Sequence, residues 1–165
     1  MRGAPVLAAL ALAACAGPVH APPAAVVATA DRGLAARGSS SFVLRTEAPG
    51  LLRPVAQAGI PCRLQARGFH ASFTSPAEIT VPNLGRRQPE ATVTCTHGGR
   101  RQSLALEPVN LTRAEEQSRA MAENQADSPG FPGLGLVTAA IVGGLRPSRP
   151  SDVWGYRNAT LTFGD

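Results

Sequence analysis

Apolar and polar residues alternate through much of the segment 42–109. In the stretch GIPCRLQA every second residue from Ile60 is apolar, and Arg63 and Gln65 lie between them. The same period of two recurs in FHASFTS, AEITVP, ATVTC and QSLALE. Because successive side chains of a strand point to opposite faces, this pattern predicts strands that each bury one face. The predicted inward positions are Ile60, Cys62, Leu64, Ala66, Phe69, Ala71, Phe73, Ile79, Val81, Val93, Cys95, Leu104 and Leu106.

Turn residues separate these predicted strands. Arg67-Gly68 and Gly98-Gly99 each lie between two alternating runs and predict hairpins, which together favour a meander. The 165 residues are 44% hydrophobic but only 4% aromatic, which indicates one domain with a modest core. We therefore expect a mainly β fold, a small antiparallel β-sandwich over residues 41–110.

The three cysteines fall into two groups. Cys62 and Cys95 both occupy inward positions, and inward positions on packed sheets can bring Cβ atoms within the 3.5–4.5 Å that a disulfide needs. Pairing also requires an oxidising compartment, which an exported chain meets. We predict a Cys62–Cys95 disulfide; the alternative is two buried free thiols. An odd third thiol, Cys15, then needs its own explanation.

The amino terminus has the pattern of a secretory signal. Arg2 precedes an uncharged apolar run over residues 6–14, which is shorter than the roughly 20 residues that span a bilayer. The sequence LAAC at residues 12–15 resembles the lipobox of bacterial lipoproteins. That resemblance implies a signal peptide over residues 1–14 and acyl chains, such as palmitate, on Cys15. The alternative is ordinary cleavage after the Ala-x-Ala at residues 14–16, which leaves a soluble periplasmic protein.

The next segment, 15–40, is rich in Ala, Pro, Gly and Ser and predicts a flexible tether behind the lipidated residue. Ala16 follows the cysteine where an Asp would, in the enterobacterial pattern, retain a lipoprotein in the inner membrane. By that resemblance we expect the outer membrane, on its periplasmic face, as the location.

The central segment resembles a known module. Cys62, the aromatic Phe69 and Phe73, the stretch TSPAEITVP and the strand ATVTC followed by a glycine turn are similar to the PEGA-like module of proteobacterial lipoproteins. The resemblance covers residues 59–109. It implies a small β-sandwich of envelope proteins and brings no catalytic residues. The chain departs from the pattern in its loop 83–90, which carries two arginines where a short polar turn is expected.

Two further segments follow the module. In the polar helix or linker predicted over residues 111–129, Thr112 and Glu115 fit a capping box. Residues 130–165 combine a Gly/Ala-rich apolar segment, predicted as a short helix, with a terminal strand in NATLTF. Trp154 and Tyr156 are expected to cover the core or a sheet edge.

The candidate binding residues are two arginine pairs, Arg86-Arg87 and Arg100-Arg101. Successive turns of a meander lie about 20 Å apart, beyond a Debye length of about 8 Å, so the pairs are not expected to act together and solvated turn arginines are the alternative. No histidine spacing predicts a metal site, and no motif predicts a catalytic nucleophile. We expect no cofactor, no metal and no nucleic acid.

Together these patterns predict a membrane-anchored lipoprotein of the cell envelope that is not an enzyme. We expect its acyl chains to bind the membrane, and its folded part to have a structural role or to bind envelope proteins or polymers. Two alternatives stay open: a soluble periplasmic binding protein, and an envelope hydrolase whose site is assembled only in the fold.

Overall fold

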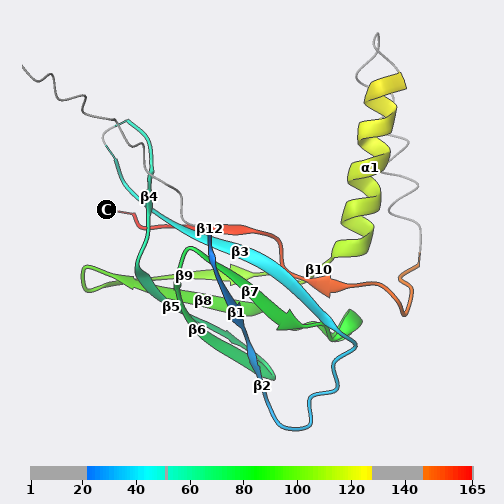
Figure 1. The fold of residues 1–165 in the computed structure, drawn as a ribbon, viewed down its shortest axis with the longest axis horizontal. Coiled ribbons are helices and arrows are strands. Elements are labelled where there is room, and N and C mark those ends of the chain that lie inside the picture. Colours follow the sequence, from blue (N-terminus) through cyan, green and yellow to red (C-terminus); the bar gives the residue numbers. More distant parts are fainter. Residues whose placement is uncertain (1–21, 51, 128–146, 165) are drawn as a thin grey trace, which may run out of the picture.

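The computed structural model describes residues 22–50, 52–127 and 147–164, which form a mainly β fold (Figure 1). The described strands make two five-stranded sheets, which we call sheet A and sheet B, and one two-stranded pair. The predicted signal peptide 1–14, Cys15 and the Gly/Ala-rich segment 133–145 lie outside the described residues.

Sheet A has the strand order β1-β7-β3-β12, with β4 also paired to β3. Sheet B has the order β2-β6-β5-β8-β9. The strands of sheet A are β1 (Ala24–Val27), β3 (Ser39–Ala48), β4 (Val55–Gln57), β7 (Ala77–Pro82) and β12 (Ala159–Thr162). The strands of sheet B are β2 (Thr29–Ala30), β5 (Ile60–Ala66), β6 (Phe69–Ser75), β8 (Ala91–His97) and β9 (Arg100–Leu106). The separate pair consists of β10 (Val109–Asn110) and β11 (Trp154–Gly155).

Sheet B confirms four of the strands predicted from the alternation. In β5, β6, β8 and β9 the predicted inward residues are buried or half-buried, and Arg63 and Gln65 are exposed. The two hairpins also form as predicted. Gly68 has a φ of 96° and Gly98 a φ of 56°, a left-handed backbone that glycine adopts at little cost. Glycine at these turns therefore permits the tight connections.

The predicted meander is wrong at β7. After β6 the chain passes through Pro76 into β7, which pairs with β3 in sheet A instead of extending sheet B. β8 then returns to sheet B and pairs with β5. Pro76 has no backbone N–H to donate to a ladder, which makes it a natural point for the pairing to change. The alternation of β7 is confirmed, but alternation does not specify which sheet a strand joins.

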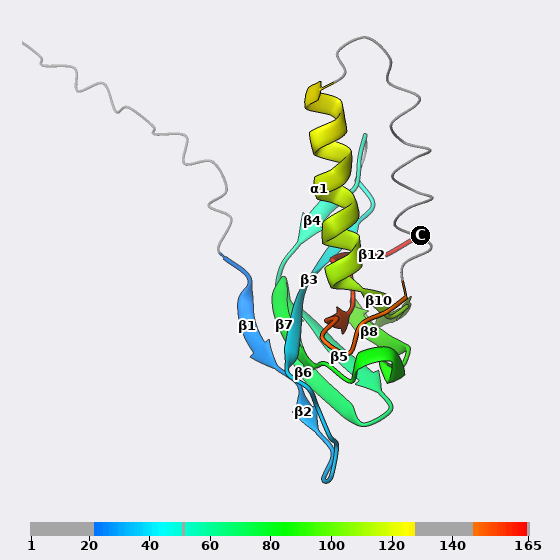
Figure 2. The ribbon, with the colours of Figure 1, turned by 90° about the vertical axis from the view of Figure 1, so that its right-hand side faces the viewer.

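The expectation of a flexible tether over residues 15–40 is wrong for residues 39–40, which begin β3, and for residues 24–30. β1 pairs in parallel with β7 in sheet A, and β2 pairs antiparallel with β6 in sheet B, so this segment covers one edge of each sheet (Figure 2). Covering an edge strand satisfies backbone groups that would otherwise be open to pairing with another chain. The side chains of β1 and β2 are mostly exposed, so their sequence carries no alternation that could have revealed them.

Sheet A is mixed, and the expectation of a wholly antiparallel fold is wrong there. β3 is antiparallel to β7 and β4, but β1 is parallel to β7 and β12 is parallel to β3. Parallel neighbours need a long connection, and both of these pairings join segments that are distant in the sequence. The terminal strand predicted in NATLTF is confirmed as β12, which lies at an edge of sheet A.

The hydrophobic core draws buried residues from both sheets and from the segment around Tyr156. Phe42 and Leu44 come from β3 of sheet A, whereas Leu64 and Val93 come from β5 and β8 of sheet B. Its largest fully buried apolar side chains are Tyr156, Phe42, Phe69, Leu44, Leu64, Ile79, Val81 and Val93. One shared core therefore couples the two sheets.

The helix α1 (Leu111–Asp127) confirms the predicted polar helix. The predicted capping box is wrong, because Asn110 caps the helix: its Oδ1 accepts the N–H of Arg113 at 3.0 Å. Thr112 has another role, since its Oγ1 accepts the N–H of Val153 at 3.0 Å and holds the carboxy-terminal segment against the helix. Among the described residues, no helix is both long and apolar enough to cross a membrane.

Candidate functional site

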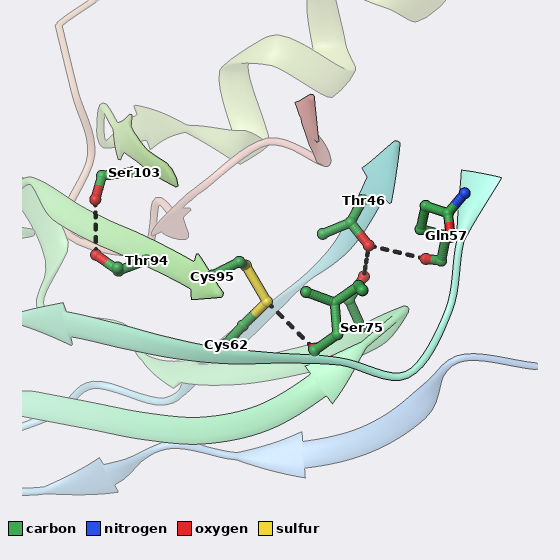
Figure 3. The surroundings of a disulfide bond; sticks show 8 residues. Thr46, Gln57, Cys62, Ser75, Thr94, Cys95 and Ser103 are labelled. Carbon is green, nitrogen blue, oxygen red and sulfur yellow. Dashed lines mark hydrogen bonds between the residues drawn. A yellow bond between two sulfur atoms is a disulfide. The ribbon is translucent and has the colours of Figure 1, made fainter. Parts of the chain in front are cut away.

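Cys62 and Cys95 form the predicted disulfide (Figure 3). Cys62 on β5 lies directly opposite Cys95 on β8, with their Cα atoms 4.1 Å apart, and both side chains are buried. The bond joins neighbouring strands of sheet B, whereas we expected it to join positions on two packed sheets. The difference follows from the departure of β7, which leaves β5 and β8 adjacent. The disulfide thus fixes a strand pair that is not consecutive in the sequence.

A buried polar cluster lies beside the disulfide and joins the sheets (Figure 3). Thr46 on β3 is hydrogen-bonded through its Oγ1 to the Oγ of Ser75, at 2.9 Å, and to the carbonyl oxygen of Gln57, at 2.8 Å. Both hydroxyls have partners, so their burial leaves no unsatisfied group. None of these groups titrates near neutral pH, and we assign the cluster a structural role.

The two arginine pairs lie at opposite ends of β8. Arg86 and Arg87 belong to the short 3₁₀ helix η1 (Gly85–Arg87), which precedes β8, whereas Arg100 pairs with His97 where β8 turns into β9 (Figure 1). A strand of 7 residues spans about 20 Å, which exceeds a Debye length of about 8 Å. The structure therefore keeps the two pairs apart, although their connection is not that of a meander.

Two arginines from distant segments join Arg86 and Arg87. Together they line a cavity of about 330 Å³ at this end of the sheets, which we call the arginine cavity. One of the additional arginines precedes β3, and the other precedes β11. Within residues 22–50, 52–127 and 147–164, no Asp or Glu lines this cavity. Its lining is Arg37, Leu84, Gly85, Arg86, Arg87, Ser148, Arg149, Pro150 and Trp154.

A buried asparagine positions three sides of the arginine cavity. Asn83 is only 4% exposed, and its Oδ1 accepts the N–H of Gly85 at 2.9 Å and the N–H of Trp154 at 3.1 Å. Its own N–H donates to the carbonyl of Gly38 at 2.9 Å, and its carbonyl accepts the N–H of Arg37 at 2.9 Å. Asn83 therefore ties η1, β11 and the segment before β3 to one another.

A buried aspartate positions the fourth side. Asp152 Oδ2 accepts a hydrogen bond from Asn110 Nδ2 at 2.6 Å and from the N–H of Arg149 at 2.9 Å. The backbone around Arg149 is thereby fixed to the amino terminus of α1. Arg37 Nη1 also donates to the carbonyl of Pro150 at 3.4 Å, which links two walls of the cavity.

Tyr156 and Trp154 differ in their surroundings. Tyr156 is only 1% exposed, its hydroxyl donates to the carbonyl of Pro89 at 2.6 Å, and its ring packs edge to face on Phe42. Burial raises the pKa of Tyr156 to about 12, although a hydrogen bond with the Gln88 side chain acts in the opposite direction. Tyr156 is thus a core residue, as predicted. Trp154 is half-buried, and its buried Nε1 has no hydrogen-bond partner among the described residues.

A larger cavity of about 900 Å³ adjoins the arginine cavity. The two share Arg37, Leu84 and Arg87. The larger cavity adds Arg67 but also Glu90, so its charge is less one-sided. Among the described lining residues, those of the arginine cavity therefore carry the larger positive charge.

The histidines do not gather into a site in the described part of the chain. His70 Nδ1 lies 4.0 Å from Asp31 Oδ1, and both side chains are mostly exposed. His97 packs near the ring of Phe163, and His20 lies outside the described residues. No group of three His, Cys, Asp or Glu residues within the described ranges could hold a metal ion.

The fold and the site thus define a mainly β protein with two sheets, a disulfide and a basic cavity at one end of the strands. In comparisons with protein-family models, with curated proteins and with solved structures, nothing matches this chain. The resemblance of residues 59–109 to the PEGA-like module stays a prediction.

The sequence pointed to two of the four arginines that line the arginine cavity and did not point to the other two. Arg86 and Arg87 were predicted, but Arg37 and Arg149 lie in segments without periodicity, and nothing local connects them to η1. Asn83 carried a weak signal, because Asn before a glycine-containing turn often bonds its own backbone two residues on, as it does here. Its bond to Trp154 had no signal in the sequence.

Proposed function

We propose that this chain is a lipoprotein of a bacterial cell envelope, anchored by acyl chains on Cys15. In this proposal a noncatalytic β-sandwich, made from sheets A and B, binds envelope proteins or polymers near the outer membrane. The buried Cys62–Cys95 disulfide is the observation that supports export most directly, because such bonds persist in oxidising compartments. With two cysteines in that bond, Cys15 is the remaining thiol, and it ends the lipobox-like sequence LAAC.

The start of β1 gives the proposal a geometric consequence. Only residues 16–23 separate Cys15 from β1 at Ala24, and a fully extended chain of this length reaches at most roughly 30 Å. A lipid on Cys15 would therefore hold the β-sandwich close to the membrane. Its partners would be molecules of the membrane surface or of the adjacent polymer layer, not distant structures.

The experiment that tests this proposal is metabolic labelling with palmitate, combined with intact-mass analysis of the mature protein. The native chain should take up label, begin at Cys15 and sediment with membranes, because two or more acyl chains anchor stably. Cys15→Ser should take up no label and leave the membrane fraction. The double variant Cys62→Ala/Cys95→Ala is the matched control, and it should still be labelled.

A soluble periplasmic binding protein is the second candidate, because residues 14–16 also satisfy the Ala-x-Ala rule. It predicts an unlabelled product whose first residue follows Ala16. Finding that product from the native chain would overturn the lipoprotein proposal and leave the β-sandwich and its disulfide unaffected.

A further inference from the structure

Four arginines line the arginine cavity, and no Asp or Glu is among the lining residues that the structure describes. Two of them, Arg86 and Arg87, come from η1, and Arg37 and Arg149 come from segments more than a hundred residues apart in the sequence. Like charges that converge raise the local potential and attract anions. A cavity concentrates this effect compared with a flat surface, because its walls displace water.

Trp154 lies on the same wall as the arginines. Trp154 lines the arginine cavity, and its buried Nε1 has no acceptor among the described residues. Because Nε1 itself has almost no exposed surface, it is not available to a ligand in the cavity. The match to an acceptor-rich anion therefore comes from the guanidinium groups of the four lining arginines.

The backbone that carries these donors is fixed before any ligand arrives. Asn83 holds Gly85 and Trp154 through one side-chain oxygen, and Asp152 holds the N–H of Arg149. Both of these positioning residues are buried. A site that is ordered in advance loses less entropy on binding than one that must assemble.

From this arrangement we infer that the arginine cavity binds a phosphoryl group. Guanidinium groups bind phosphate oxygens through paired hydrogen bonds, and several of them suit a group that carries more than one negative charge. The cavity of about 330 Å³ is of the size found for small ligand sites. The phosphoryl group belongs either to a soluble molecule or to a lipid headgroup. The inference deepens the binding role of the proposed function and does not require the lipid on Cys15.

The sequence contains a single Trp, so the fluorescence of Trp154 reports on this cavity directly. The test titrates the full chain carrying Cys15→Ser, exported and oxidised, with inorganic pyrophosphate at physiological ionic strength. We expect a saturable change of fluorescence. The double variant Arg86→Gln/Arg87→Gln should weaken binding by about tenfold or more, since it removes two of the four arginines whose charge-assisted hydrogen bonds would hold the phosphoryl oxygens. Its circular dichroism should be unchanged, because both side chains are exposed.

The matched control is Arg100→Gln/Arg101→Gln, which removes the same charge at the other end of β8. It should change the affinity by less than about twofold, because that distance exceeds the Debye length of about 8 Å at physiological ionic strength. Equal weakening by both double variants would mean general attraction of anions and would overturn the inference. Absence of a saturable signal, with calorimetry also showing no heat of binding, would overturn it as well.

Vesicles distinguish the two sources of the phosphoryl group. If phosphatidylglycerol vesicles, but not phosphatidylcholine vesicles, compete with pyrophosphate, and Arg86→Gln/Arg87→Gln abolishes this competition, the ligand is a lipid headgroup. If pyrophosphate binds and vesicles do not compete, the ligand is soluble. Both outcomes support the cavity as a phosphoryl site. Palmitate labelling does not depend on the pyrophosphate titration. A failure of the anion site can therefore be distinguished from a failure of the lipoprotein proposal.

Discussion

Sheet A and sheet B share one core but are built from the sequence in opposite ways. Four strands of sheet B come from residues 60–106, two tight hairpins join them in pairs, and the disulfide fixes the central pair. Sheet A takes β1, β3, β7 and β12 from residues 24 to 162 and contains both parallel pairings. Closing long loops costs more chain entropy than closing short ones. Sheet B is thus specified by local patterns and sheet A by distant contacts.

The contrast between the two sheets also explains where the candidate site lies. The arginine cavity forms where segments of distant origin meet: η1, the residues before β3 and the residues around β11. At the far end of β8, Arg101 and Arg63 line another cavity, of about 640 Å³, whose described lining residues all belong to sheet B. The local structure of sheet B therefore brings together two arginines in its cavity, whereas the long-range contacts of sheet A and β11 bring together four.

Removing the disulfide should have the largest effect on this comparison. We expect Cys62→Ala/Cys95→Ala to lower the free energy of unfolding by about 3–4 kcal/mol, because the bond closes a sequence separation of 33 residues. Urea denaturation under oxidising conditions measures this. Cys15→Ser should leave stability within about 0.5 kcal/mol. A loss below about 1 kcal/mol for the double variant would show that the local pairing of sheet B needs no cross-link.

Shortening a buried side chain of the last strand, β12, tests the stability of sheet A. Leu161 on β12 is buried in the core, and Leu161→Ala should cost about 3 kcal/mol through lost burial and a cavity. Leu52→Ala is the control, because Leu52 is 100% exposed and should change stability by less than about 0.5 kcal/mol. Fluorescence and circular dichroism should report one coincident transition. Two separate transitions would show that the sheets unfold independently despite their shared core.

The single Tyr provides a pH test of the junction between β11 and the core. The pKa of Tyr156 is raised from 10.0 to about 12, so its protonated form is favoured in the folded state. Its contribution to stability is fully present below about pH 10 and is lost as the pH rises towards about 12, by roughly 2–3 kcal/mol. The chain has no Lys, so few other groups titrate in this window.

Urea denaturation at several pH values measures the loss, and Tyr156→Phe should remove this pH dependence. Phenolate absorbance of the folded protein provides an independent reading. Titration of the phenol near its ordinary pKa of about 10 would contradict its burial against Phe42 and Pro89.

The smallest expected effect concerns the attachment of α1. Asn110→Ala removes the cap of the helix and a partner of Asp152, and it should cost about 1 kcal/mol. Ser118→Ala is the matched control on the exposed face and should be close to neutral, because Ala favours a helix. Thermal unfolding followed by circular dichroism measures both. Equal effects would show that Asn110 does not fix the segment that carries Arg149.

Much of sheet B could be predicted because each of its signals is local. Ile60, Leu64 and Phe73 alternate with polar neighbours, and Gly68 and Gly98 mark the turns. β1 and β2 could not be predicted in this way, since backbone pairing at a sheet edge places no demand on side-chain pattern. The candidate site was predictable only where its charges are consecutive, at Arg86 and Arg87.

The sequence by itself determined which side chains of the central segment face inward and that Cys62 and Cys95 are able to pair. Both features can be predicted locally, because the alternation has a period of two residues and a glycine turn involves two to four residues. The tertiary structure alone decided that β7 leaves its neighbours, that β12 lies beside β3, and that Arg37 and Arg149 meet η1. Those choices depend on the free energy gained by burying one common core. Residues throughout the chain contribute to that free energy, so no local sequence pattern predicts it.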